Sequence, residues 1–147
     1  FPVWITSSAV YRLFKPKCNL LLFAISLVKA DFIRNLRGLW LVVAKPLNES
    51  VSTKEAYSGI KPKMPSESLT ELLKRDKREW QGSVVNDFEP HIFAAHPTIK
   101  ALKQSMLDAG AVYAAMSGSG SAVFGLFDER PTLQLPADTF LHIEQIE

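Results

Sequence analysis

Two short apolar runs separated by serine and glycine constrain this sequence more than any other feature. Residues 111–116 and 122–127 are short, bounded and rich in β-branched and aromatic side chains, so each run predicts a β-strand. Between them the chain reads Ser117-Gly118-Ser119-Gly120-Ser121. A connection this short favours direct pairing of the two strands. The sequence therefore predicts a β-hairpin over residues 110–127.

The loop of this hairpin has the composition of a site that accepts an anion. Alternating glycines allow positive φ and let another backbone or an anion approach closely. Successive backbone N–H groups in such a loop can form a concave anion site, and the serine hydroxyls add donors. The same composition also suits a plain hairpin turn, because a short Gly/Ser loop is a weak signal by itself. Composition alone leaves both interpretations open.

Length, composition and charge narrow the class of protein. The chain has 147 residues, the length of one domain, and its 47% hydrophobic and 22% charged residues are enough to build a core. A formal net charge of +2 is too small to indicate nucleic acid or an anionic membrane as a partner. The single cysteine, Cys18, excludes an internal disulfide and a cysteine-based metal site. The three histidines lack the spacing of metal ligands, so we expect no metal site.

The most apolar run of the chain is Asn19–Val28, which is too short to span a bilayer. Its basic flanks also suit a signal peptide, but we find neither a small-residue cleavage site nor a start methionine near it. A buried strand or helix is therefore the favoured interpretation. Because a lone cysteine suits a reducing compartment, we expect a cytoplasmic protein that does not enter a membrane.

Upstream of the hairpin, the apolar pattern predicts a buried strand and a capped helix. Residues 39–45 are apolar almost throughout and are ended by Pro46, which is typical of a central strand buried on both faces. Ser52 and Glu55 form a capping box, so a helix begins there, and Gly59 ends it.

The middle of the chain predicts further helices. Ser66 or Ser68 caps one that runs to about Arg75. Residues 80–95 indicate another helix or a pair of turns, with Pro90 at a helix start or a kink. Five apolar residues of this segment share a face at helical spacing: Val84, Val85, Phe88, Ile92 and Phe93.

Polar residues within the same segment suggest chemistry only weakly. The run Asn86-Asp87-Phe88-Glu89 carries two carboxylates, which suit metal binding or acid–base work, but the surface of a helix is the favoured interpretation. His91 and His96 accompany no serine or cysteine motif, so we interpret both as ordinary core or surface histidines.

The C-terminal part completes a mixed fold. Residues 98–109 form an amphipathic pattern closed by Gly110, and residues 140–146 alternate as a last strand at a sheet edge. The order of strand, helices, hairpin and strand indicates the α+β class. We therefore expect a small antiparallel sheet with helices packed on one face.

The sequence of residues 96–127 resembles the third motif of the GHMP small-molecule kinases, and the run GAVYAAMSGSGSAVFGLF is its most specific part. Leu39–Pro46, Val51–Tyr57 and Val84–Phe93 match the same family in the same order. The resemblance covers residues 38–147 and implies the ferredoxin-like C-terminal lobe of these kinases.

Residues 1–37 match the family poorly. Residues 9–17 contain no glycine where the family has a glycine-containing passage. We interpret this segment either as a divergent connection or as a remnant of a disturbed reading frame. The family has two lobes, so we expect the chain to be a fragment whose partner is the missing N-terminal lobe.

The resemblance implies ATP-dependent phosphorylation of an alcohol group on a small molecule in non-mevalonate isoprenoid biosynthesis, with Mg²⁺ accompanying ATP. It places five residues beside the nucleotide phosphates and gives Thr53 a place in the substrate pocket. The alternative for Thr53 is helix capping together with Ser52. The phosphate-proximal residues are Ser117, Gly118, Ser119, Gly120 and Ser121.

The glycine-rich nucleotide loop of the family, its lysine and its catalytic acidic residue have no match in this chain. We therefore assign no catalytic residue and expect the chain alone to be inactive. Two alternatives stay open: the C-terminal lobe of another GHMP kinase, and a stand-alone ferredoxin-like binding module without catalysis, because fold alone does not decide function.

Overall fold

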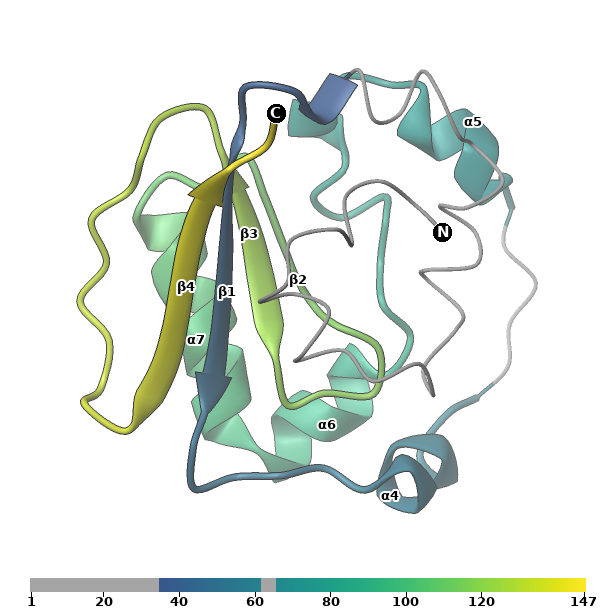
Figure 1. Cartoon of the computed structure of the whole chain (residues 1–147). Helices are drawn as coiled ribbons and strands as arrows, with labels where there is room; N and C mark the ends of the chain where they lie inside the picture. The colour runs from purple at the N-terminus through teal and green to yellow at the C-terminus, as the bar shows by residue number, and fades with distance from the viewer. Residues whose placement is uncertain (1–34, 62–65) are drawn as a thin grey trace.

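A central strand, β1 (Trp40–Pro46), organises the fold in the computed structural model, which describes residues 35–61 and 66–147 (Figure 1). It lies between β3 (Val123–Phe127) and β4 (Thr139–Gln145), and β2 (Tyr113–Met116) pairs with β3. All pairings are antiparallel, in the order β2-β3-β1-β4. The predicted hairpin, central strand and edge strand are confirmed.

Alternate residues of β1 enter two separate cores, because successive side chains of a strand point to opposite faces of the sheet. Leu41 and Val43 pack in one cluster, and Val42 and Ala44 pack in the other. All four are buried, which confirms burial on both faces of the central strand.

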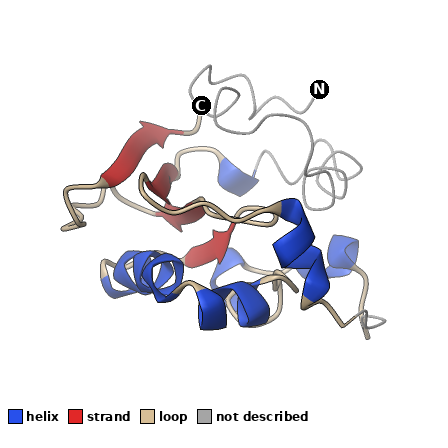
Figure 2. Cartoon of the chain, turned by 90° about the horizontal axis from the view of Figure 1, so that it is seen from below, coloured by secondary structure: helices blue, strands red, loops and turns tan. Residues whose placement is uncertain are grey.

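Two helices, α6 (Glu89–Ala95) and α7 (Pro97–Asp108), lie against the Val42 face of the sheet (Figure 2). The buried stripe of α7 consists of Ile99, Leu102 and Met106, as the amphipathic pattern predicts. Gly110, the residue after the C-cap of α7, has a φ of +95° and turns the chain towards β2. Pro90 lies at the start of α6, as expected.

The Leu41 face is covered by α5 (Leu69–Leu73) and by the turns that follow the short 3₁₀ helix η2 (Lys77–Glu79), which itself buries no side chain. The Trp80 ring meets the Tyr113 ring edge-on at 5.9 Å, and the Tyr113 hydroxyl donates to the Val84 carbonyl at 2.9 Å. Burial raises the pKa of Tyr113, so this hydroxyl stays a donor. Packing on this face comes from short helices and turns, and the two longer helices occupy the other face.

Both alternatives for residues 80–95 occur in part, because turns form first and a helix follows, and the predicted shared face is wrong at Val85. Residues 80–88 form turns, and Val85 is 62% exposed instead of sharing the buried face. The reason is local: the Asn86 side chain accepts a hydrogen bond from the Phe88 N–H at 3.0 Å. Such a side-chain turn competes with helical hydrogen bonding, so the helix begins only afterwards.

The two capped helices form where expected. In α4 (Thr53–Ser58) the Ser52 hydroxyl accepts from the Glu55 N–H at 3.0 Å, and Gly59 is the C-cap. In α5 the cap is Ser68 rather than Ser66, and the helix ends before Arg75.

The predictions for the apolar run of residues 19–28 and the glycine-poor residues 9–17 lie outside the described residues. Within residues 35–61 and 66–147, no helix is long and apolar enough to cross a bilayer.

A substitution at Gly125 tests the contact between α7 and the sheet. A β-carbon there would lie 3.0 Å from the Met106 sulfur and 3.0 Å from the Phe127 ring. We expect Gly125→Ala to lower the free energy of unfolding by about 1–3 kcal/mol through overpacking, and Met106→Ala to lower it by about 2–5 kcal/mol through a cavity.

The double variant separates overpacking from a general loss of stability. Because Met106→Ala removes the sulfur contact of the new methyl group and leaves only the contact with the Phe127 ring, the two losses are expected to sum to more than the loss in the double variant. Urea unfolding of all four proteins measures this. Simple additivity would contradict the close approach at Gly125.

Candidate functional site

The Gly/Ser loop is a tight, packed turn between β2 and β3. The Ser117 N–H donates to the Ala122 carbonyl at 2.8 Å, and the Gly120 N–H donates to the Ser117 carbonyl at 3.0 Å. Gly118 and Gly120 have φ of +56° and +92°, which glycine adopts without strain. Ser119 and Ser121 are only 7% and 4% exposed, so the loop is packed against the rest of the fold.

Side chains from the Asn86–Glu89 run hold the loop from the outer edge of β2. The Asn86 amide donates to the carbonyls of both Met116 and Gly118 at 2.8 Å. A Glu89 carboxylate oxygen accepts from the Met116 N–H at 2.7 Å. The backbone polar groups of Met116, on the strand edge that no other described strand pairs with, are therefore satisfied by side chains.

The surface interpretation of the Asn86–Glu89 run is wrong for Glu89. Its side chain is 12% exposed and forms an ion pair with Lys103 at 2.6 Å. One feature of the sequence could have indicated this ion pair. Lys103 lies four residues after Ile99, so both project from the same side of α7 as its buried stripe. A lysine among buried apolar positions indicates a buried partner.

The other wall of the loop comes from the segment that joins β1 to α4. The Ser121 hydroxyl donates to the Glu49 carbonyl at 3.1 Å, and a β-carbon at Gly120 would lie 3.4 Å from the Val51 side chain. Thr53 follows this contact as the first residue of α4 and is exposed. The structure therefore brings the two predicted site elements to the same end of the sheet (Figure 1).

Helix capping does not account for Thr53. The side-chain hydrogen bond of the cap comes from the hydroxyl of Ser52. The Thr53 side chain is left exposed next to the segment that contacts the loop, which is compatible with a place in a substrate pocket.

A second polar cluster lies beside this wall and was not predicted. His96, between α6 and α7, has one ring nitrogen 2.9 Å from a Glu49 carboxylate oxygen and the other 2.7 Å from a Glu55 carboxylate oxygen. The hydrogen bonds that the His96 ring donates to Glu55, the larger effect, and to Glu49 raise the pKa of His96. The hydrogen bond to His96 lowers the pKa of Glu55. This site favours an imidazolium between two carboxylates.

His91 lies next to this cluster and explains Gly59. One of its ring nitrogens is 3.1 Å from the Glu55 carbonyl. A β-carbon at Gly59 would lie 2.0 Å from the His91 ring, and the φ of Gly59 is −101°. Glycine is needed here for close approach and not for a left-handed conformation.

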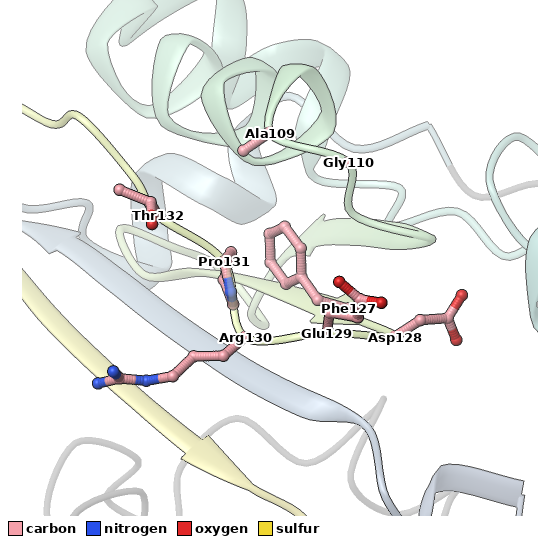
Figure 3. A pocket seen from close by; sticks show the side chains of 8 residues that line it. All are labelled: Ala109, Gly110, Phe127, Asp128, Glu129, Arg130, Pro131 and Thr132. Atoms are coloured by element: carbon pink, nitrogen blue, oxygen red, sulfur yellow. The ribbon is translucent and has the colours of Figure 1, made fainter.

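A hollow of about 370 Å³ lies at the opposite end of β3 and α7 (Figure 3). Two of its charged side chains, Asp128 and Arg130, have partners elsewhere. Asp128 pairs with Arg78 at 3.0 Å, and Arg130, which points away from Phe127, lies 5.7 Å from the Trp40 ring centre. We therefore place the candidate site at the Gly/Ser loop.

Metal-ligating side chains do not gather anywhere in the described part of the chain. Within residues 35–61 and 66–147, no group of three or more His, Cys, Asp or Glu residues could hold a metal ion. The donors at the candidate site are backbone N–H groups and the Ser117 hydroxyl, which suit an anionic ligand, whereas the Ser121 hydroxyl already donates to the Glu49 carbonyl.

The loop, its bracing and the surrounding fold define the class of protein. The family model described as GHMP kinases C terminal matches residues 62–135, so the chain belongs to the GHMP kinases. A homoserine kinase structure from Cytophaga hutchinsonii is similar in fold, with a TM-score of 0.52 and 18% identity over 74% of this chain and 42% of that chain.

Curated relatives narrow the comparison. A 4-diphosphocytidyl-2-C-methyl-D-erythritol kinase from Bacteroides fragilis is 48% identical over 93 residues, which are 63% of this chain and 34% of the relative. One of the same name from Cytophaga hutchinsonii is 46% identical over 99 residues, 67% of this chain and 36% of the relative. The chain thus spans about a third of the length of these relatives.

The buried ion pair of Glu89 and Lys103 can be compared with the exposed ion pair of Glu71 and Lys74. Lys103 in the Glu89 pair is 17% exposed, and Lys74 in the Glu71 pair is 62% exposed. We expect Lys103→Met to cost about 3 kcal/mol, because it leaves a buried carboxylate unpaired. We expect Lys74→Met to cost less than about 1 kcal/mol, because that pair is exposed.

Chemical denaturation of the two variants and the parent chain measures this difference. Equal losses for both lysines would contradict a structural role for the Glu89 pair. Gain of stability in Lys103→Met would show that an apolar contact serves this position as well as the ion pair.

Proposed function

We propose that this chain forms the C-terminal half of the active-site cleft of an ATP-dependent 4-diphosphocytidyl-2-C-methyl-D-erythritol kinase. The reaction moves the γ-phosphoryl group of ATP to the 2-hydroxyl of 4-diphosphocytidyl-2-C-methyl-D-erythritol and releases ADP and a proton. It belongs to non-mevalonate isoprenoid biosynthesis in the cytoplasm. The observation that carries this proposal is the 46–48% identity to curated relatives of that name.

The geometry of the Ser117–Ser121 loop supports a role beside the phosphate chain of ATP. Within the described residues, the N–H groups of Gly118 and Ser121 have no hydrogen-bond acceptor. Gly118 is half-buried and Ser121 is buried, so the Gly118 N–H is the more accessible donor for a phosphate oxygen, and the loop has no bulky side chain of its own to block the approach. Phosphoryl transfer depends mainly on positioning and charge stabilisation, and a braced loop of this kind contributes to positioning.

Thr53 is proposed to line the substrate pocket. Its exposed hydroxyl lies at the start of α4, close in sequence to the residues that contact the loop. A hydroxyl can donate to a phosphate or accept from a diol of the substrate.

Mg²⁺ is proposed to reach the cleft with ATP. Mg²⁺ prefers oxygen ligands, and the phosphates of ATP would supply some of them. When bound, it neutralises phosphate charge. This chain contributes no catalytic acid or base to the proposal, and the N-terminal lobe is its required partner.

A chimera tests the function. Residues 38–147 replace the matching C-terminal part of the Bacteroides fragilis relative, and ATP-dependent phosphorylation is followed by mass spectrometry. We expect 4-diphosphocytidyl-2-C-methyl-D-erythritol to gain one phosphoryl group, and we expect neither the chain nor the N-terminal part alone to turn over.

The same chimera tests the two rival functions. Phosphorylation of homoserine but not of 4-diphosphocytidyl-2-C-methyl-D-erythritol would assign the lobe to another GHMP kinase. A folded chimera without any nucleotide binding would favour a binding module without catalysis and would contradict our proposal.

Two glycines with similar backbones test the loop within the active chimera. Gly120 and Gly82 have φ of +92° and +95°, but only a β-carbon at Gly120 would approach a neighbour, the Met116 sulfur at 3.0 Å. We expect Gly120→Ala to lower kcat/KM by about 100-fold by displacing the loop. Gly82→Ala carries similar backbone strain and is expected to keep its activity. Equal activity losses in the two variants would contradict a positioning role for the loop.

A further inference from the structure

The imidazole of His96 joins three parts of the fold at the end of the sheet that carries the candidate site. It follows α6 and precedes α7, and its two ring nitrogens meet carboxylates from elsewhere. Glu49 lies between β1 and α4, and Glu55 lies within α4, so one side chain holds both ends of the segment 49–55, which contains Thr53. His96 itself is 16% exposed.

The geometry favours one protonation state. An ionised carboxylate only accepts hydrogen bonds, so both ring nitrogens must donate to form both contacts. A neutral imidazole donates from one nitrogen only, and an imidazolium donates from both. The bridge is therefore complete only when His96 is charged, and each contact is then a charge-assisted hydrogen bond.

The bridge connects directly to the Ser117–Ser121 loop. The residue that provides one carboxylate, Glu49, also accepts the Ser121 hydroxyl at its carbonyl oxygen, at 3.1 Å. Two residues later, Val51 lies against Gly120. A change in the position of Glu49 must therefore be transmitted to the loop.

We propose that His96 is a positioning residue for the site: as an imidazolium it fixes the segment 49–55, and through Glu49 it fixes Ser121 and the phosphate-proximal loop. The name of the ligand at this loop rests on the proposed function, whereas the coupling itself does not. His96 does not touch the loop and acts through Glu49.

The coupling depends on pH in a defined direction. The carboxylates raise the pKa of His96 above 6.5, so its contribution is complete below pH 6.5 and is lost as the pH rises through the raised pKa. The pKa of Glu55 is lowered below 4.5, so its contribution is complete above pH 4.5 and is lost as the pH falls through the lowered pKa. The other titratable group facing this cluster is His91 on α6, which also lowers the pKa of Glu55.

Nuclear magnetic resonance of the full chain tests the proposal without any ligand. The backbone amides of Gly120, Ser121 and Thr53 and the ring of His96 are followed from about pH 5 to about pH 9, a range that includes the pKa of an unperturbed histidine, about 6.5. We expect the three amides to shift with the midpoint of the His96 ring, above pH 6.5. In His96→Gln this transition is expected to disappear, because the amide of glutamine does not titrate.

A matched control separates coupling from a general effect of losing a histidine. His142 on β4 also faces a carboxylate, that of Glu144 at 3.1 Å, but β1 lies between its strand and β3, the strand into which the loop runs. His142→Gln is expected to leave the loop transition in place. Glu49→Gln is expected to reduce the transition and keep the fold, since it removes one charge and retains the backbone carbonyl.

The outcomes also distinguish this proposal from the proposed function. Loop amides that do not follow the His96 ring in the unmodified chain would overturn the positioning role, even if the chimera is an active kinase. A loop that follows His96 in a chain whose chimera fails to phosphorylate its substrate would support the positioning role and overturn the kinase proposal. A transition that persists in His96→Gln would assign the coupling to another group and overturn the role of His96.

Discussion

The candidate site depends on how the unpaired edge of β2 is satisfied. A strand at the edge of a sheet exposes backbone N–H and C=O groups that must find partners. Here the side chains of Gln81, Asn86 and Glu89 take the place of a neighbouring strand at Ala114 and Met116. Because Asn86 also reaches the Gly118 carbonyl, the same interaction that completes the sheet fixes the start of the Gly/Ser loop. The buried charge of Glu89 then requires Lys103, which ties this edge to α7.

Local sequence patterns predicted most of the fold, because strand alternation, helix capping and helix amphipathicity each depend on residues that are close together in sequence. The apolar run of β1, the capping box at Ser52 and Glu55, and the stripe of α7 all formed as expected. Residues 80–88, for which the pattern left a helix and a pair of turns open, show where such rules do not decide. An apolar spacing suitable for a helix was overridden by a short-range hydrogen bond of Asn86 and by packing of Trp80 against Tyr113.

The bracing of the site could not be predicted, because its contacts join residues that are distant in sequence. The Glu89 contact to Met116 spans 27 positions, and the His96 contact to Glu49 spans 47. Nothing local distinguishes Glu89 or His96 from a surface carboxylate or an ordinary histidine. The loop itself could be predicted from its glycines. A positive φ is a property of a single residue, and glycine adopts it most readily.

The two edges of the sheet differ in whether side chains already bond their outward backbone groups, and this difference affects where another strand could pair. Side chains occupy the backbone donors and acceptors of β2 that face outward at Met116, so another chain cannot add a strand there without displacing them. At the opposite edge, β4 pairs with β1 alone among the described strands, and its Leu141 is 40% exposed. An added strand would therefore disturb fewer of the described contacts at β4 than at β2.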